Sequence, residues 1–318
     1  MQIDAFIDYV TGVRRFSPRT AEIYRDVLEE YASQQTEISA TALRNYEVWL
    51  LDKRKESPRT VGHHMSVLSS YCRWLMKQGE LASNPVRLVH RPKTEKRLPV
   101  FYREDSMKDY FASSACDASA EQLELLLQLP PEDKTAVDLY GRRLRRLIVS
   151  MLYGTGMRRS ELISLNVTSV DASRGCISVL GKGDKMREIP LISSLYDEIS
   201  LYLDAAGHMF GGSADRNTPL LRTPAGNRLY PVYVDRAVKE ALGNVRDITG
   251  QKSAHILRHT LASELLDRGT DLNSIKELLG HSSLAATQVY THNTIERLKK
   301  VYANAHPRAT KNGGNNGD

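Results

Sequence analysis

The chain has 318 residues, of which 41% are hydrophobic, and its net charge at neutral pH is +6. This length accommodates two domains with ordinary cores. The sequence has no apolar run near the ~20 residues that a membrane helix needs, no secretory signal at its start, and only three, widely separated cysteines. We therefore expect a cytoplasmic protein without a membrane association, a disulfide framework or a zinc knuckle.

The charge is unevenly distributed. Residues 103–141 contain nine acidic and three basic side chains, so the rest of the chain is more basic than the net charge suggests. A basic surplus of this kind indicates a polyanionic partner, most plausibly nucleic acid. The alternative is a basic face that only maintains solubility. The acidic stretch itself is weakly patterned, which predicts a surface excursion or a contact site for a partner or neighbouring subunit.

Four helices are predicted in residues 1–88. Apolar residues recur every three or four positions from Ile3 and again after Ser17, Ser39 and Ser57, until Gly79 ends the last helix. Ser17 and Ser57 each open the same Ser-Pro-Arg-Thr sequence, with a serine cap and a proline at the first helical position. We interpret this repeat as repeated capping chemistry in a small helical bundle.

A basic linker is predicted at 89–102. Residues 84–99 contain three prolines and six basic or histidine side chains with little periodicity. If this segment crosses DNA, its arginines and lysines add affinity that depends on salt and not on sequence. The alternative is a solvated tether.

The second domain, 103–302, is predicted to be mostly helical. An apolar stripe defines a helix over 142–152, whose other face holds four arginines. This helix ends at the Gly-Thr-Gly sequence 154–156, where the glycines stop it.

One β-hairpin interrupts these helices. Segments 176–180 and 187–191 read as strands on either side of the glycine-containing turn 181–185. Helical patterns resume in the 230s and from His255 onward, and the tail 303–318 has the composition of a disordered segment.

Two candidate phosphate ligands lie next to glycines. Arg158 follows the turn at 154–156, and Glu161, one helical turn later, is placed to orient its guanidinium. Lys182 lies at the tip of the predicted hairpin, where it can reach a groove and donate a proton to a departing oxygen. Taken singly, each is more commonly a surface residue. The GxxxxGK[ST] spacing of a P-loop is absent.

Further candidates lie on the predicted helix from His255. His255 and Arg258 are three residues apart, and Arg258 supplies a second guanidinium for a phosphate. Two histidines four apart, His255 and His259, suit zinc, but the HExxH glutamate and a third ligand are missing. No metal is therefore expected.

The last two candidates follow a helix with a buried stripe over 272–279. Gly280 stops that helix, His281 comes directly after it, and Tyr290 follows nine positions later. A phenol has a pKa near ~10, so a nucleophilic Tyr290 needs a base or neighbouring cations. A tyrosine here is otherwise a packing residue.

Together these segments resemble the tyrosine recombinase (phage integrase) family. The resemblance rests on GTGMRRSEL, GKGDK, HILRH, LLGHS and VYTH, in the family's order and spacing. It covers residues 150–302 strongly, and the chain's length and C-terminal sequence are most similar to the Xer branch. The resemblance implies a mainly α fold, with an N-terminal SAM-like helical bundle that binds DNA and a mixed α/β, mostly helical catalytic domain.

The resemblance also implies the roles of six residues. Tyr290 attacks the scissile phosphate, giving a 3′-phosphotyrosyl bond and a free 5′-hydroxyl. Arg158 and Arg258 stabilise the phosphorane, and Lys182 is the general acid. His255 and His281 assist proton transfer and phosphate binding. Neither a metal, ATP nor another cofactor is needed, because the covalent bond retains the phosphodiester energy.

Two features depart from the family pattern. Arg159 stands where relatives often carry an aliphatic residue, and the acidic stretch 103–141 is long for a compact Xer protein. Both leave the six catalytic positions intact.

The resemblance further predicts a homo- or hetero-tetramer on double-stranded DNA, with a partner recombinase or regulatory protein. A helix at 295–302 then docks on the adjacent subunit, or alternatively packs on its own domain. The expected task is site-specific recombination, such as chromosome dimer resolution. The alternatives are a mobile-element integrase, a type IB topoisomerase and, in a different class, an inactive architectural DNA-binding protein.

Overall fold

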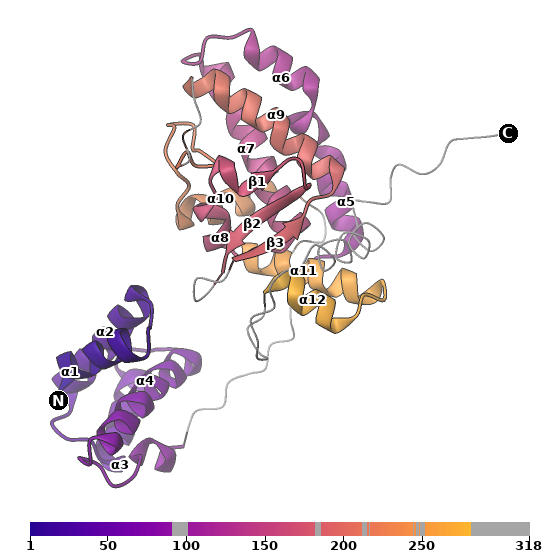
Figure 1. Cartoon of the computed structure of the whole chain (residues 1–318). Coiled ribbons are helices and arrows are strands. Elements are labelled where there is room, and N and C mark those ends of the chain that lie inside the picture. Colours follow the sequence, from indigo (N-terminus) through magenta and orange to yellow (C-terminus); the bar gives the residue numbers. More distant parts are fainter. Residues whose placement is uncertain are drawn as a thin grey trace. The chain divides into compact units, whose positions relative to one another are not determined.

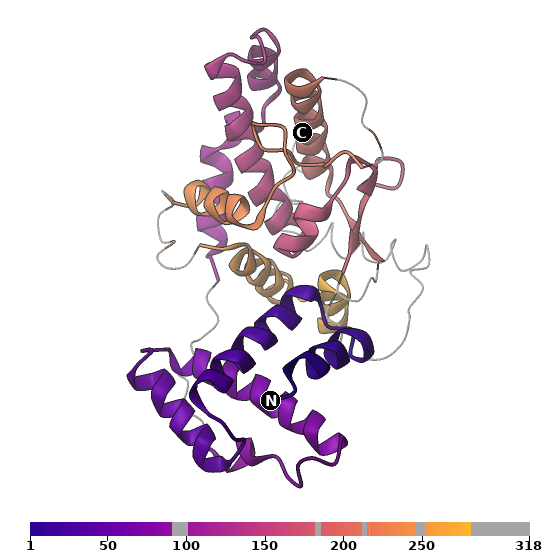
Figure 2. The same cartoon turned by 90° about the vertical axis from the view of Figure 1, so that its left-hand side faces the viewer.

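The computed structural model divides into two compact units, Met1–Leu98 and Pro99–Asp318, each described below by itself. Helices dominate both units, as the predicted mainly α fold requires (Figures 1 and 2). In the part of the chain that is described, no helix is long and apolar enough to span a bilayer. The described residues are 1–90, 101–181, 186–211, 215, 217–243, 245, 248 and 252–280.

Within residues 1–90, the first unit contains four α-helices, and they begin where the sequence predicts. The helices are α1 (Ile3–Asp8), α2 (Pro18–Gln34), α3 (Ala40–Asp52) and α4 (Pro58–Lys77), with a π turn at Tyr9–Val13 and a 3₁₀ turn at Pro85–Leu88. The hydroxyl oxygens of Ser17, Ser39 and Ser57 each accept a hydrogen bond from the backbone amide of the third residue of α2, α3 and α4. These caps satisfy donors that a helix cannot satisfy internally.

Aromatic side chains fill the core of the first unit. Phe6, Tyr71 and Trp74 pack together, with ring centroids 5.1 to 5.7 Å apart. The hydroxyl of buried Tyr71 accepts a 2.7 Å hydrogen bond from the backbone amide of Gln2. Both tryptophans of the chain, Trp49 and Trp74, belong to this unit. Tryptophan fluorescence therefore follows the unfolding of the first unit, whereas far-UV ellipticity follows the helices of both.

The second unit surrounds one long helix, α7 (Lys134–Thr155). Its other elements are α5 (Glu104–Ser113), α6 (Ala120–Leu127), α8 (Arg159–Ser164), β1 (Val170–Asp171), β2 (Cys176–Leu180), β3 (Met186–Pro190), α9 (Ser193–Phe210), α10 (Pro231–Ala241), α11 (Ala254–Asp267) and α12 (Leu272–Leu279), with 3₁₀ turns at Ala115–Ala118 and Val167–Ser169. Helix α7 contacts α6, α9, α10 and α11 (Figure 1). It is consequently buried almost all round.

The burial of α7 corrects the prediction that its four arginines occupy an opposite face. Arg143 and Arg146 are buried. Arg143 donates to the carbonyl of Ser119 and the side chain of Gln122, and Arg146 pairs with Glu198 of α9 at 3.2 Å. A buried guanidinium persists only with such partners, and the partners lie on segments that the helical pattern of α7 does not reveal.

Those partners also correct the prediction that the acidic stretch 103–141 is a surface excursion. Within it, α5 and α6 bury Met107, Tyr110, Leu123 and Leu126 in the core of the second unit. The segment before α7 consists of two short helices, of 10 and 8 residues, joined by a 3₁₀ turn. Such short helices explain why the hydrophobic pattern of this stretch is weak.

A three-stranded antiparallel sheet lies beside the helices (Figure 1). The predicted hairpin is confirmed as β2 and β3, which pair from Cys176 opposite Pro190 to Leu180 opposite Met186. The short strand β1 pairs with β2 and was not predicted, because two residues carry no readable alternation. On β3, Arg187 and Ile189 face inward, and Glu188 points to the other face, where it binds Arg174.

A buried carboxyl group joins α7 to α11. The Tyr153 hydroxyl of α7 donates a 2.6 Å hydrogen bond to Glu264 of α11. Burial raises the pKa of Glu264 from 4.5 to about 7, because a charged carboxylate is poorly solvated in the interior.

This raised pKa predicts a pH-dependent stability. The folded chain holds the Glu264 proton more tightly than the unfolded chain, so the stabilisation is fully present below pH 4.5 and is lost as the pH rises through 7. We expect the free energy of unfolding of the second unit to fall by about 3 kcal/mol across this window. Glu264→Gln should abolish that dependence in ellipticity-monitored urea unfolding. Glu240→Gln, at an exposed position, is the control and should keep the pH dependence of the unmodified chain. If Glu264→Gln keeps that dependence as well, the assignment to Glu264 is contradicted.

Candidate active site

Arg158 is placed by a sharp turn between α7 and α8. Helix α7 ends at Thr155, and Gly156 follows in the left-handed conformation with φ of +61°. A Cβ atom on Gly156 would lie 2.6 Å from Leu279 Cδ2, so only glycine fits this approach of the turn to α12. Arg158 is then the N-terminal cap of α8, half-exposed beside the end of α12.

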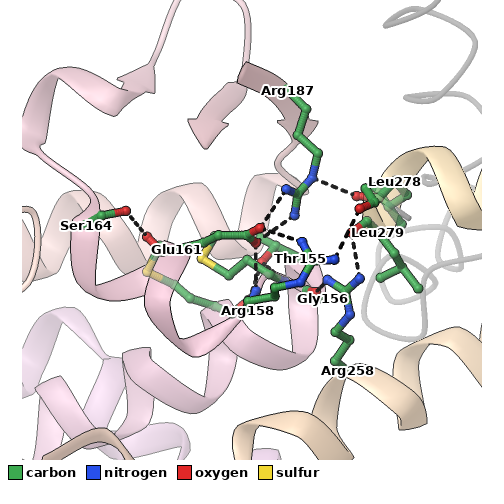
Figure 3. Close-up of polar contacts among 12 residues, drawn as sticks. Thr155, Gly156, Arg158, Glu161, Ser164, Arg187, Arg258, Leu278 and Leu279 are labelled. Atoms are coloured by element: carbon green, nitrogen blue, oxygen red, sulfur yellow. Dashed lines mark hydrogen bonds and ion pairs between the residues drawn. The ribbon is translucent and has the colours of Figure 1, made fainter. Parts of the chain in front are cut away.

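Glu161 holds Arg158 as the sequence predicts. Arg158 Nη1 donates to Glu161 Oε1 at 2.8 Å, and the Arg158 backbone amide donates to Glu161 Oε2 at 2.8 Å (Figure 3). Burial alone would raise the pKa of Glu161, but hydrogen bonds from Arg187 and Arg158 outweigh it and lower the pKa to about 2. Glu161 is therefore a carboxylate at any physiological pH.

Arg187 is a residue of this cluster that the sequence reasoning treated only as part of a strand. Its Nη1 and Nη2 atoms donate to both carboxylate oxygens of Glu161, at 2.9 and 2.8 Å. Its Nε donates to the carbonyl of Leu278 at 3.2 Å. The alternation of side chains along β3 could have predicted this role. Arg187 shares the inward face with Ile189, and an arginine that faces the core requires a partner.

Arg258 occupies the other side of the Arg158 turn. It is buried on α11, and its two terminal nitrogens donate to the carbonyls of Gly156 and Leu279, each at 2.6 Å. Burial and then the charges of Arg158 and Arg187 lower its pKa to about 10. Arg258 thus keeps its charge at neutral pH.

The end of α12 is the point where the three arginines meet. The consecutive carbonyls of Leu278, Leu279 and Gly280 accept hydrogen bonds from Arg187, Arg258 and Arg158 respectively (Figure 3). These carbonyls lack partners within the helix, and cations are favourable at a helix C-terminus. Two of the three guanidinium groups bind the Glu161 carboxylate, and the third, of Arg258, binds backbone carbonyls. The cluster therefore retains positive charge that suits an anion.

His255 lies close to this cluster on the exposed side of α11. Burial, followed by the charges of His259, Arg258 and Arg158, lowers its pKa, so the imidazole is neutral at physiological pH. Its Nε2 lies 3.1 Å from that of His259. Across the described ranges, no group of three His, Cys, Asp or Glu side chains could hold a metal ion.

The structure thus brings Arg158, Arg258 and His255 together. Arg159, in contrast, pairs with Asp235 of α10. Three other predicted site residues, Lys182, His281 and Tyr290, lie outside the described residues, as do 295–302 and the tail 303–318. Lys182 precedes β3 by only a few residues, and His281 directly follows Gly280.

Comparison with known proteins identifies the family. The sequence profile of the Phage integrase family matches residues 119–297, a segment that contains all six predicted site residues. The chain belongs to the phage integrase family. It is a tyrosine recombinase, a class of enzymes that cleaves and rejoins DNA at specific sites.

Relatives of similar length support this assignment. The chain is 35% identical to tyrosine recombinase XerC of Pelobacter propionicus, over 97% of this chain and 96% of the relative. It is 32% identical to XerC of Chlorobaculum parvum, over 96% of this chain and 94% of the relative. Over this span the resemblance to the Xer branch is confirmed.

Solved recombinase structures share the fold. XerH bound to palindromic difH substrate has a TM-score of 0.63 at 19% identity, over 95% of this chain and 83% of that chain. A lambda integrase (75–356) dimer bound to a COC′ core site has a TM-score of 0.58 at 17% identity, over 90% and 97%. The predicted fold class of this recombinase is therefore confirmed.

Proposed function

We propose that this recombinase uses Tyr290 as its nucleophile. The phenol gives its proton to a neighbouring base as its oxygen attacks the scissile phosphorus, the bond to the 5′ oxygen breaks, and a 3′-phosphotyrosyl bond forms. Lys182 gives a proton to the departing 5′ oxygen, which leaves as a hydroxyl. The 5′-hydroxyl of a second strand then reverses the attack, so strands exchange without an external energy source.

Arg158 and Arg258 stabilise the negative charge of the pentacoordinate phosphorus in this proposal. The observation that supports it is the cluster of three guanidinium groups at the end of α12, two of which bind Glu161. Fixed hydrogen bonds hold these groups before DNA binds, so little reorganisation is needed during the reaction. His255 and His281 assist proton transfer and phosphate contact.

The first unit is proposed to be a DNA-binding domain, 1–88, joined by the basic linker 89–102 to a catalytic domain, 103–302. Its support is a structural repeat. Arg15 and Lys55 both have positive φ and lie two residues before Ser17 and Ser57, and the arginine of each Ser-Pro-Arg-Thr sequence is exposed. Two similar basic surfaces suit the regular charges of a DNA backbone.

We propose that the active species is a tetramer on double-stranded DNA, composed of this chain alone or with a partner recombinase, and that the segment 295–302 docks on the adjacent subunit. The XerC relatives favour chromosome dimer resolution over integration of a mobile element as the biological role. An architectural protein would have no need for a preformed arginine cluster.

A nicked duplex tests the chemistry. The duplex carries the site that the full-length chain selects from a random-sequence library, with a nick that lets the cleaved end diffuse away. We expect a denaturant-stable adduct, and peptide mapping should place the DNA on Tyr290. Tyr290→Phe should give no adduct. Attachment to another residue, or no adduct at all, would overturn the proposal. On a separate supercoiled plasmid that carries two copies of the site, relaxation without recombinant products would indicate a topoisomerase.

A further inference from the structure

Arg187 makes buried polar contacts that the packing of β3 does not require. It is only 5% exposed and faces inward opposite Val179, at a position that an apolar residue would fill at lower cost. Its guanidinium instead binds both oxygens of Glu161 and the carbonyl of Leu278 (Figure 3). One side chain therefore connects β3, the start of α8 and the end of α12.

Each of these three elements adjoins a residue of the proposed chemistry. In the sequence, Lys182 lies four residues before the start of β3. Arg158 is the N-terminal cap of α8, and His281 follows Gly280, the C-terminal cap of α12. Arg187 also packs closely against Gly280, where a Cβ atom would lie 3.0 Å from Arg187 Nη1. The planar fork of an arginine can hold two carboxylate oxygens and a carbonyl at once, which the ammonium of lysine cannot do.

We propose that Arg187 is a positioning residue for DNA cleavage. It orients the Glu161 carboxylate so that this carboxylate holds Arg158 in its phosphate-binding geometry, and it fixes the end of α12 against the same carboxylate. This inference rests on the proposed function of Arg158. Arg187 need not touch DNA, since its terminal nitrogens are directed at Glu161.

A double-substitution cycle tests this role in the full-length chain. Arg187→Lys keeps the charge and loses the fork, so we expect single-turnover cleavage of the nicked duplex to slow by roughly 10- to 100-fold, with DNA affinity changed by less than about twofold. In an Arg158→Lys background the same change should slow cleavage much less, because the group that Arg187 positions has already been replaced.

The matched control is Arg174→Lys. Arg174 binds both oxygens of Glu188, the next residue of β3, at 2.5 and 2.7 Å on the other face of the sheet, and its replacement should leave cleavage unchanged.

Equal fold-losses from Arg187→Lys in both backgrounds would mean that Arg187 is merely structural. An unaffected Arg187→Lys chain would also overturn the inference. If Arg158→Lys itself cleaves normally, the proposed function fails first. If Arg187→Lys does not fold by ellipticity, Arg187→Gln replaces it in the same two backgrounds, and the same comparison of fold-losses decides the outcome.

Discussion

Glu161→Ala is expected to lower the free energy of unfolding of the second unit by about 3–5 kcal/mol. The substitution removes the carboxylate that accepts four hydrogen bonds, two from Arg187 and two from Arg158. Arg187 is buried, and among the described residues its charged guanidinium would keep the Leu278 carbonyl as its sole hydrogen-bond partner. An uncompensated buried charge costs more than the loss of an exposed ion pair.

Two spectroscopic probes separate this effect from a general loss of structure. Urea unfolding followed by ellipticity should shift to lower denaturant concentration, whereas the transition followed by tryptophan fluorescence should remain, because both tryptophans belong to the first unit. Glu188→Ala is the control on β3, since its partner Arg174 is exposed to solvent, and it should cost at most about 1 kcal/mol. Equal losses in the free energy of unfolding for Glu161→Ala and Glu188→Ala would refute the prediction that Glu161 compensates the buried charge of Arg187.

Arg258→Lys is expected to slow DNA cleavage by about 100- to 1,000-fold. Arg258 spans the carbonyls of Gly156 and Leu279, so it fixes the turn that presents Arg158 and the end of the helix that precedes His281. The single ammonium of lysine cannot bridge both carbonyls and also face a phosphate. Its loss therefore affects charge placement and geometry together.

The measurement is single-turnover cleavage of the nicked duplex at saturating protein, so that weakened binding does not enter the rate. Arg268→Lys is the matched control at the end of the same helix. Arg268 pairs with Glu104 at a partly exposed position, and its conservative replacement should leave the rate within about twofold. A normal rate for Arg258→Lys would exclude Arg258 from phosphate stabilisation.

The local structure of the chain was largely readable from its sequence. The serine caps at Ser17, Ser39 and Ser57, the stop at Gly156 and the hairpin at 176–190 all depend on residues within one or two turns of each other. Such short-range preferences act before tertiary contacts form. The strand β1 was missed because it has only two residues.

The errors concern contacts between segments that are distant in sequence. Arg143 and Arg146 looked like one face of an exposed helix, but α5, α6 and α9 bury them. The acidic stretch lacked a clear period because its two helices are short, yet its apolar residues complete the core. Hydrophobic patterns reveal which side of a segment is apolar, and they do not reveal which polar residues other segments will cover.

The sequence by itself determined which residue types were available for phosphate chemistry and, through the order of their motifs, the family to which the chain belongs. Only the tertiary structure decided how Arg258 is held, because its partners are the backbone carbonyls of Gly156 and Leu279. It also revealed Arg187 as the third member of the cluster. Every residue has a backbone carbonyl, so a sequence does not show which carbonyls accept hydrogen bonds from side chains. A site built on the carbonyls at the end of a helix can therefore be recognised only in the folded structure.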